Sequence, residues 1–141
     1  MQNLIPKKEE EERRLKALAE YRILGTKPES CYDDITKIAA STCNVPISLM
    51  TLVDKDKQWF KSKVGLEINE TKRDWSFCTH AIQENSPLII QDAFQDERFI
   101  NNPLVTGDPK IRFYAGFPLK NRDGNKLGTL CVIDRKPGNL S

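Results

Sequence analysis

The strongest pattern of hydrophobic and polar positions lies between residues 111 and 134. Apolar and mixed positions alternate over residues 111–119, which is the two-residue period of a pleated strand. Apolar side chains fill neighbouring positions over residues 127–133, so both faces of a second strand are expected to be buried. The Asp123-Gly124 pair between them predicts a turn. These residues therefore predict a hairpin at the centre of a sheet.

One face of the first strand in this hairpin carries large polar groups. Arg112 and Tyr114 lie there beside Gly116, which has no side chain and leaves room. A charged group and a phenol on an inner strand require partners or a polar cavity. We therefore expect either a binding site or an internal salt bridge in which Asp92 or Asp74 pairs with the guanidinium group.

Two helices are predicted ahead of the sheet. Oppositely charged pairs four residues apart predict a helix over residues 7–24, with residues 1–14 as a solvated helical lead. Apolar rows begin at Leu15, so the later half is expected to pack on the domain, and a signalling or dimer stalk is the alternative for the charged start. A serine and an aspartate at capping-box spacing predict a second helix over residues 30–43. Its apolar stripe, expected to cover the sheet, consists of Ile35, Ile38, Ala39 and Thr42.

Short strands and loops fill the middle of the chain. Dense apolar and β-branched content predicts a central strand over residues 47–53, with a return strand over residues 58–64. Three lysines on the return strand are expected to guard a sheet edge against pairing with another molecule: Lys57, Lys61 and Lys63. A loop, a short helix, a strand and a helical turn are predicted over residues 66–74, 75–84, 88–90 and 96–99. Residues 101–109 contain two prolines and a glycine, which is typical of a lid or binding loop.

Composition narrows the class of protein. The chain has 141 residues, enough for one domain with its own core, and its net charge is +2 with 30% charged residues. Such a balance indicates neither nucleic-acid binding nor membrane binding, and no apolar run approaches the roughly 20 residues of a spanning helix. We expect a cytoplasmic protein. Four widely spaced cysteines indicate reduced, buried thiols and neither a disulfide framework nor a zinc site: Cys31, Cys43, Cys78 and Cys131.

The order of these elements predicts an α+β domain on an antiparallel sheet. Six segments also carry a resemblance: Tyr21-Arg22-Ile23-Leu24 with Pro28-Glu29, Gln58-Trp59-Phe60-Lys61, Ser76-Phe77-Cys78-Thr79-His80-Ala81, Asn102-Pro103-Leu104-Val105, Arg112-Phe113-Tyr114-Ala115-Gly116 and Gly128-Thr129-Leu130-Cys131-Val132-Ile133-Asp134. With these segments the chain resembles the GAF domain, specifically the bacterial signalling subgroup.

The resemblance implies a fold and a role. It implies five to six antiparallel strands, in the order 2-1-5-4-3 for the five predicted ones, with helices on one face and a ligand pocket under loops on the other. It further implies an input module joined to a histidine kinase, a diguanylate cyclase or a similar output domain. Residues 1–141 are expected to form this single domain, with a core over residues 15–134. The long C-terminal helix of the family is missing after Ser141, which indicates a fragment or a short member.

Few side chains are arranged for chemistry. Cys78 and His80 are two positions apart on the predicted helix and point about 200° apart, so a thiolate–imidazole pair is not expected. Ser76 and His80 are four apart and share a face, which suits a ligand contact, although a structural role for the histidine is the alternative. Cys78 and Cys131 lie among apolar neighbours and are expected to behave as small hydrophobic residues. We predict no catalytic residue, no metal site and no cofactor.

The sequence thus predicts a sensory module that binds a small, polar or anionic molecule and passes its state to an output domain of the same polypeptide. The site is expected between the strand over residues 111–119, residues 75–80 and the loop over residues 101–109. The candidate ligand-binding residues are Arg112, Tyr114, Trp75, Ser76, Cys78, His80 and Asp92. A homodimer that transmits a signal without a ligand is the alternative. An enzyme resembling the GAF-fold reductases of free methionine sulfoxide ranks last.

Overall fold

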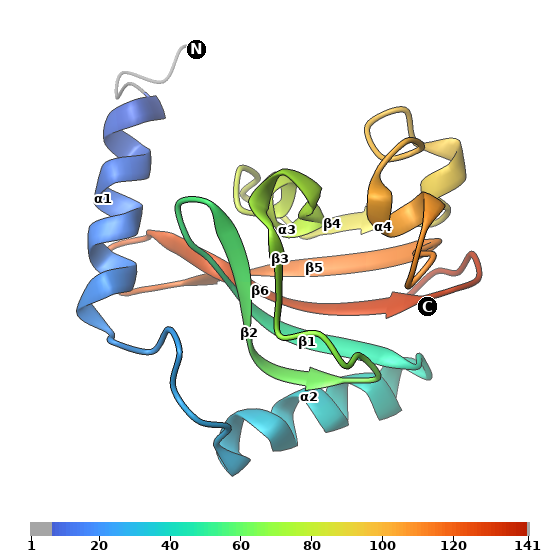
Figure 1. Cartoon of the computed structure of the whole chain (residues 1–141), viewed down its shortest axis with the longest axis horizontal. Helices are drawn as coiled ribbons and strands as arrows, with labels where there is room; N and C mark the ends of the chain where they lie inside the picture. The colour runs from blue at the N-terminus through green and yellow to red at the C-terminus, as the bar shows by residue number, and fades with distance from the viewer. Residues whose placement is uncertain (1–6, 141) are drawn as a thin grey trace.

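The structure is built on one sheet with helices on both of its faces. The computed structural model describes residues 7–140, and within them six strands form an antiparallel sheet in the order β3-β2-β1-β6-β5-β4. Helix α2 lies along one face, and the short helices α3 and α4 lie over the other (Figure 1). The elements are α1 (Lys7–Glu20), α2 (Ser30–Cys43), β1 (Ile47–Val53), β2 (Lys57–Val64), β3 (Glu70–Lys72), η1 (Arg73–Trp75), α3 (Phe77–Ala81), β4 (Leu88–Ile90), η2 (Ala93–Gln95), α4 (Pro103–Thr106), β5 (Phe113–Lys120) and β6 (Lys126–Asp134). The predicted α+β class is confirmed.

The five predicted strands occur in the predicted order. β2, β1, β6, β5 and β4 lie side by side as the order 2-1-5-4-3 requires, and every neighbouring pair is antiparallel. The added strand, β3, pairs through Glu70–Lys72 with the first residues of β2. Three residues are too few to leave a periodic pattern in the sequence. The loop predicted over residues 66–74 is therefore wrong at its C-terminal end.

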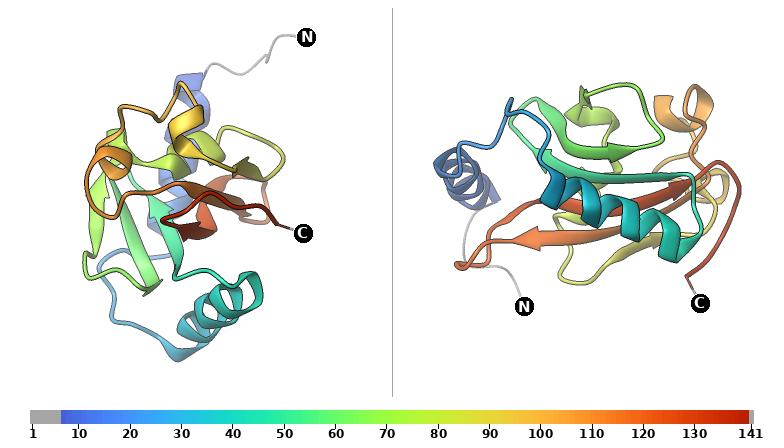
Figure 2. Two further views of the ribbon diagram at one scale, coloured as in Figure 1. Left: turned by 90° about the vertical axis from the view of Figure 1, so that its right-hand side faces the viewer. Right: turned by 90° about the horizontal axis from the view of Figure 1, so that it is seen from below.

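Strand β5 divides its side chains between two hydrophobic clusters. Phe113 and Ala115 pack in the cluster beneath α2, whereas Tyr114 belongs to the larger cluster beneath α3 and α4. This is the predicted two-residue alternation, and Figure 2 shows α2 and the short helices on opposite sides of the sheet. The segment predicted as an irregular lid contains α4, whose Leu104 and Val105 are buried in the larger cluster.

Helix α2 turns a different face to the sheet from the one predicted. Thr36 is fully buried, whereas Ile35 and Ile38 are 43% and 64% exposed. The hydroxyl oxygens of Thr36 and Ser62 lie 2.7 Å apart, and the Ser62 hydroxyl donates to Asp33 at 2.5 Å. A buried hydroxyl on β2 requires polar partners, and α2 supplies them from its threonine side. The predicted apolar stripe is therefore wrong for the exposed Ile35, Ile38 and Thr42, whereas Ala39 packs on the sheet as predicted, against the cluster of Phe113, Ala115 and Val132.

Helix α1 ends at Glu20, earlier than predicted, and its start is more firmly packed than a solvated lead. Arg14 is buried, with its Nη1 donating to the Val53 carbonyl at 2.6 Å and its Nε donating to Glu11 at 2.9 Å. The solvated character predicted as far as residue 14 is therefore wrong at that residue, and residues 1–6 lie outside the described part of the chain. The apolar cluster beneath the later half of α1 consists of Ala17, Leu18, Leu52 and Leu127.

Replacing Glu11 with glutamine is expected to loosen α1. The carboxylate also accepts a hydrogen bond from Arg73 at 2.5 Å, so it joins α1 to η1 and neutralises two guanidinium groups. Burial raises its pKa, but the hydrogen bonds from Arg14 and Arg73 outweigh burial and lower the pKa from 4.5 to about 2. Urea unfolding at pH 7 should show a loss of about 1–2 kcal/mol, below the value for a fully buried pair because water screens this carboxylate.

The pH dependence of the same contact follows from the direction of that shift. A carboxylate with a lowered folded pKa stabilises the protein above its unfolded value of 4.5, and the contribution is lost as the pH falls towards 2. The stability difference between the Glu11→Gln variant and the wild type should therefore shrink over that range. Glu12→Gln, an exposed carboxylate on the same helix, is the control, and equal losses in both variants would contradict the bridging role.

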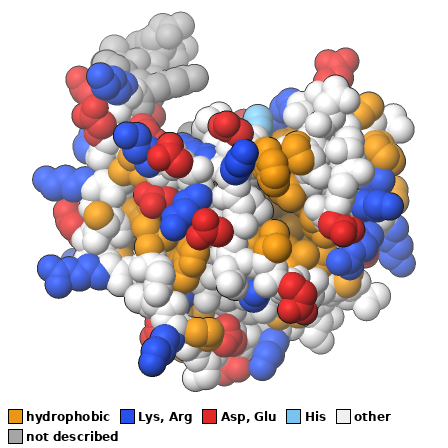
Figure 3. Space-filling model, in the orientation of Figure 1, with side chains coloured by type: hydrophobic (Ala, Val, Ile, Leu, Met, Phe, Trp, Pro, Cys, Tyr) orange, Lys and Arg blue, Asp and Glu red, His pale blue; other side chains and the backbone are white. Residues whose placement is uncertain are grey.

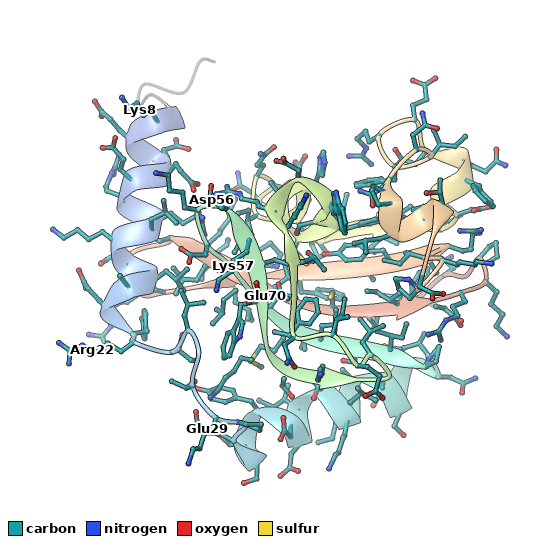
Figure 4. All side chains as sticks on the ribbon, in the orientation of Figure 1. Lys8, Arg22, Glu29, Asp56, Lys57 and Glu70 are labelled. Atoms are coloured by element: carbon teal, nitrogen blue, oxygen red, sulfur yellow. The ribbon has the colours of Figure 1, made fainter. Side chains whose placement is uncertain are left out.

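One of the predicted edge lysines is an internal anchor. The Lys61 side chain is fully covered, and its Nζ lies 2.6 Å from Glu29 and donates to the Lys27 carbonyl at 2.6 Å. Lys61 therefore holds the segment between α1 and α2 against β2, and the surface role predicted for this lysine is wrong. Lys57 lies at the surface and pairs with Glu70 at 3.4 Å across β2 and β3 (Figure 4), but the sheet edge here is β3, so the predicted role at an edge is wrong for this lysine too. Glu29 is also the N-cap residue of α2 and makes no side-chain cap, so the predicted capping box is wrong.

Candidate functional site

A small cavity lies on the face of the sheet beneath α3 and α4. Its volume is about 20 Å³, which holds about one water molecule. Hydrophobic side chains gather around a hollow on this face of the molecule (Figure 3). The lining residues are Leu49, Gln58, Phe60, Leu66, Ile68, Thr71, Phe77, Cys78, Leu104, Pro109, Ile111, Tyr114, Cys131 and Ile133. The wall is therefore mainly apolar, with two thiols, one phenol and two neutral polar groups.

A buried hydrogen-bonded group of side chains lies at the cavity wall. The Tyr114 hydroxyl donates to Cys78 Sγ at 3.2 Å. The same sulfur lies 3.0 Å from Thr129 Oγ1, which in turn lies 3.0 Å from Thr51 Oγ1. Gly116 makes this arrangement possible, because a Cβ atom there would lie 2.2 Å from the Tyr114 hydroxyl. The room that Gly116 leaves on the strand is thus filled by the tyrosine ring.

The two thiols in this group have opposite pKa shifts. Burial raises the pKa of Cys78, but hydrogen bonds from Cys131, Thr129, Thr51 and Tyr114 outweigh it and lower the value to about 6. The neighbouring Cys131 has a pKa well above the usual range, because its hydrogen bond to Cys78 and its burial both favour the neutral thiol. Burial and the nearby sulfur raise the pKa of Tyr114, so it remains a donor. The Cys78 sulfur is therefore the one of the two that more readily becomes a thiolate.

Helix α3 is shorter than predicted, and this changes the positions of Ser76 and His80. Ser76 is the N-cap residue, accepting from the Thr79 backbone nitrogen at 3.1 Å and donating to Gln58 at 2.8 Å. His80 is half-buried with its ring 4.9 Å from the ring of Phe99. Burial, and then the charge of Arg98, lower the pKa of His80, so the imidazole is neutral at pH 7. The serine hydroxyl is therefore occupied by structural contacts.

Arg112 lies one residue before β5 and outside the cavity wall. Its Nη1 donates to the carbonyls of Val105 at 3.0 Å and Ile111 at 2.9 Å, and the guanidinium group stacks over the Phe94 ring at 3.5 Å. Within the described residues no ion pair joins it to Asp92 or Asp74, so the predicted internal salt bridge is wrong. The arginine instead connects β5 to α4 and η2.

Trp75 and Asp92 hold loops in place. The Trp75 carbonyl accepts from Asn102 Nδ2 at 3.1 Å, which ties η1 to the segment before α4, and its ring packs against the larger cluster. Asp92 caps η2 by accepting from the Phe94 backbone nitrogen at 3.0 Å. The three predicted segments of the site therefore lie in contact with one another. Side chains from one segment donate hydrogen bonds to backbone carbonyls of the next.

Four of the seven predicted site residues fall into two groups, and Trp75, Ser76 and His80 belong to neither. Tyr114 and Cys78 meet at the cavity, while Arg112 and Asp92 lie near Phe94 at the start of β5. The prediction missed Thr129 and Cys131 as members of the first group. The alternation of β6 places both on one face of the sheet, which was the available signal, but the sequence does not say that α3 covers that face.

Residues 7–140 contain no cluster of three histidine, cysteine or acidic side chains that could hold a metal ion. The helices in that range are also too short or too polar to cross a membrane.

Comparison with known proteins identifies relatives of the chain. A cyclic di-GMP phosphodiesterase of Pseudomonas aeruginosa is 40% identical over 132 residues, which is 94% of this chain and 22% of that enzyme, so the chain spans about a fifth of this relative's length. Among solved structures, the GAF domain of a phosphoenolpyruvate-protein phosphotransferase from Coxiella burnetii is 11% identical with a TM-score of 0.65, covering 94% of this chain and 82% of that one.

A second solved structure with the same fold is an enzyme. The free methionine-R-sulfoxide reductase of Thermoplasma acidophilum is 13% identical with a TM-score of 0.64, covering 88% of this chain and 82% of that chain. At such identity the likeness concerns the fold alone. The model of the GAF domain family matches residues 27–141, which is most of the sequence. The chain therefore belongs to the GAF domain family.

Proposed function

We propose that the chain is a regulatory module of a bacterial signal-transduction protein and passes its conformational state to an attached output domain. The observation that carries this proposal is the 40% identity to a cyclic di-GMP phosphodiesterase over nearly all of this chain but 22% of that enzyme. The chain thus corresponds to one part of a larger signalling enzyme. Membership of the GAF family, whose domains are generally regulatory, supports the same role.

A chimera of the phosphodiesterase tests this role. In one version this chain replaces the matched segment, and in the other a flexible linker of equal span replaces it. A regulatory module should change the rate of cyclic di-GMP hydrolysis severalfold between the two versions, because coupling of about 1–3 kcal/mol is typical of linked domains. Equal rates would contradict the proposal. Hydrolysis by the isolated chain, or reduction of methionine sulfoxide by it, would contradict our further prediction that the chain has no turnover of its own.

The input that we propose is a small anionic or polar molecule bound at Arg112. Within the described residues its hydrogen bonds come from Nη1, so Nε and Nη2 remain for a ligand. A guanidinium group offers a planar fork that suits carboxylate or phosphate, and its stacking on Phe94 holds the fork in one orientation. Mass spectrometry of small molecules released from the purified, denatured protein would identify a copurified ligand.

Changing Arg112 to alanine separates this role from a structural one. The variant should lose any thermal stabilisation given by inorganic phosphate, succinate or a nucleoside monophosphate, while the free domain loses only about 1–2 kcal/mol because the arginine bonds two carbonyls and has no buried anion. Differential scanning fluorimetry measures both quantities. Lys110→Ala, an exposed cation two residues away, is the control. Stabilisation that survives in Arg112→Ala would contradict the site.

A ligand-free transmission module is the second candidate function. The cavity beneath α3 and α4 has a volume of about 20 Å³, so a metabolite does not fit inside it without movement of the surrounding loops, and this argues against a ligand within the core of the domain. This candidate predicts no copurified molecule and no stabilisation by the three probe ligands. It also predicts a homodimer, which sedimentation would detect.

A further inference from the structure

Two buried thiols from distant parts of the sequence meet in the core. Cys78 is on α3 and Cys131 is on β6, and their exposed fractions are 2% and 0%. Both side chains line the same cavity, and Cys131 is two residues from Thr129 on the same face of β6, where the Thr129 hydroxyl oxygen lies 3.0 Å from Cys78 Sγ. The two sulfur atoms therefore lie on the same side of the sheet, beneath α3. The other two cysteines differ, since Cys31 is exposed and Cys43 is half-buried on α2.

The surroundings of Cys78 are unusual for a structural thiol. A buried cysteine commonly behaves as a small hydrophobic group among apolar neighbours. Here its sulfur is in contact with the hydroxyl groups of Tyr114 at 3.2 Å and Thr129 at 3.0 Å. These groups can donate to a sulfur anion, and the lowered pKa of Cys78 is the expected consequence. The titratable groups that face it are Tyr114 and Cys131, and both have raised pKa values.

The cavity gives a small neutral molecule access to both sulfur atoms. Cys78 and Cys131 both line it, and its volume suits a molecule about as large as one water. The other lining side chains carry no charge at neutral pH, so desolvation excludes ionic oxidants. Hydrogen peroxide is the common oxidant that is both small and neutral.

We propose that Cys78 and Cys131 form a peroxide-reactive dithiol that closes to a disulfide between α3 and β6. The Cys78 thiolate attacks one peroxide oxygen, the O–O bond breaks, and the departing hydroxide takes a proton to give water and a sulfenic acid. The Cys131 sulfur then attacks the Cys78 sulfur, an S–S bond forms as the S–O bond breaks, and a second water leaves with the Cys131 proton. Peroxide is reduced by two electrons, and the two thiols are oxidised by two.

Closure of the disulfide has a structural consequence. The bond would join α3 covalently to the central strand β6, and the Tyr114 hydroxyl would lose the thiolate to which it donates. Oxidation would therefore fix the position of α3, the helix that covers the cavity. This chemistry goes beyond the proposed regulatory role and does not depend on Arg112 or on any bound ligand.

The experiment uses the wild-type chain and hydrogen peroxide. Folded protein is treated at pH 7, quenched in acid, alkylated under denaturing conditions without reductant, and digested for mass spectrometry. The expected product is a linked pair of peptides containing Cys78 and Cys131, formed before oxidation of the exposed Cys31 and absent when tert-butyl hydroperoxide, which is larger, replaces hydrogen peroxide. Oxidation that is confined to Cys31 and Cys43, or a linked pair found only after unfolding, overturns the proposal.

Variants separate the roles of the two thiols. In a Cys31→Ser and Cys43→Ser background, Cys131→Ser should leave a sulfenic acid on Cys78, which dimedone added together with denaturant at each time point converts to a stable adduct, whereas Cys78→Ser should leave Cys131 unreactive. The rate of sulfenic acid formation should rise with pH as Cys78 becomes a thiolate, and Tyr114→Phe should move the midpoint of this rise to higher pH because a donor is lost. A midpoint that does not move, or a reactive Cys131 in place of Cys78, would show that the thiols are not arranged as proposed. Circular dichroism establishes that each variant is folded. The peptide mapping of the oxidised wild-type chain does not depend on any of these variants.

Discussion

Replacing Tyr114 with alanine is expected to destabilise the domain by about 3–5 kcal/mol, the range for removal of a buried aromatic ring. The Tyr114 side chain is 1% exposed, and its ring lies 5.1 Å from the ring of Phe77 in the larger hydrophobic cluster. Gly116 lies directly beneath this ring, so nothing on the strand can fill the space that is left. Urea unfolding followed by tryptophan fluorescence measures the loss, which should appear as a lower midpoint with an unchanged slope.

Tyr114→Phe is the matched control for this prediction. It keeps the ring and removes the hydroxyl that donates to Cys78, so the expected loss is about 1 kcal/mol. A large difference between the two variants would assign the stability to ring packing. Equal losses would instead mean that the hydrogen bond to the sulfur dominates, which contradicts the packing account.

The second large effect is expected at Gly128, where alanine should cost about 3 kcal/mol or more. Gly128 lies on β6 opposite Leu52 of β1, and a Cβ atom there would be 1.8 Å from the Thr51 carbonyl oxygen. The obstacle is backbone, so the two central strands must separate to admit one methyl group. Thermal unfolding and equilibrium unfolding in urea should both show the loss, or the variant should fail to accumulate in soluble form.

Gly138→Ala is the control for the steric argument. A Cβ atom at that glycine would lie 3.5 Å from the Phe113 ring, which is an ordinary contact distance. The change in the free energy of unfolding should stay within about 0.5–1 kcal/mol. If Gly128→Ala were as well tolerated as Gly138→Ala, the close approach of β6 to β1 would not be a constraint on the sheet.

Together these positions suggest how the domain would transmit a signal. Tyr114 joins the central sheet to α3 through Cys78, and Thr129 joins the same sulfur to β1 through Thr51. Oxidation of the Cys78 sulfur would therefore alter contacts of α3 with three adjacent strands, β1, β6 and β5. Packed interiors respond to such changes by shifts of whole elements because they have little free volume.

The sequence by itself determined the hairpin over residues 111–134, the alternation of β5 and the antiparallel α+β class. Each of these follows from local periodicity or from the chemistry of a turn, which nearby residues specify. The GAF resemblance added the strand order, which the structure confirms. The three segments of the predicted site also meet, since Asn102 bonds to Trp75 and Arg112 bonds to Val105.

The tertiary structure alone decided which side of each element is covered and which distant polar groups pair. Periodicity shows that α2 has two faces, but the buried Ser62 on β2 selects the one that carries Thr36. The local sequence around Lys61 predicts an exposed side chain. In the structure the side chain is covered, because Glu29 from another segment neutralises its charge. The contact of Cys78 with Tyr114 likewise depends on where α3 docks. These choices depend on free energies of pairing between residues far apart in the chain, and no local pattern contains that information.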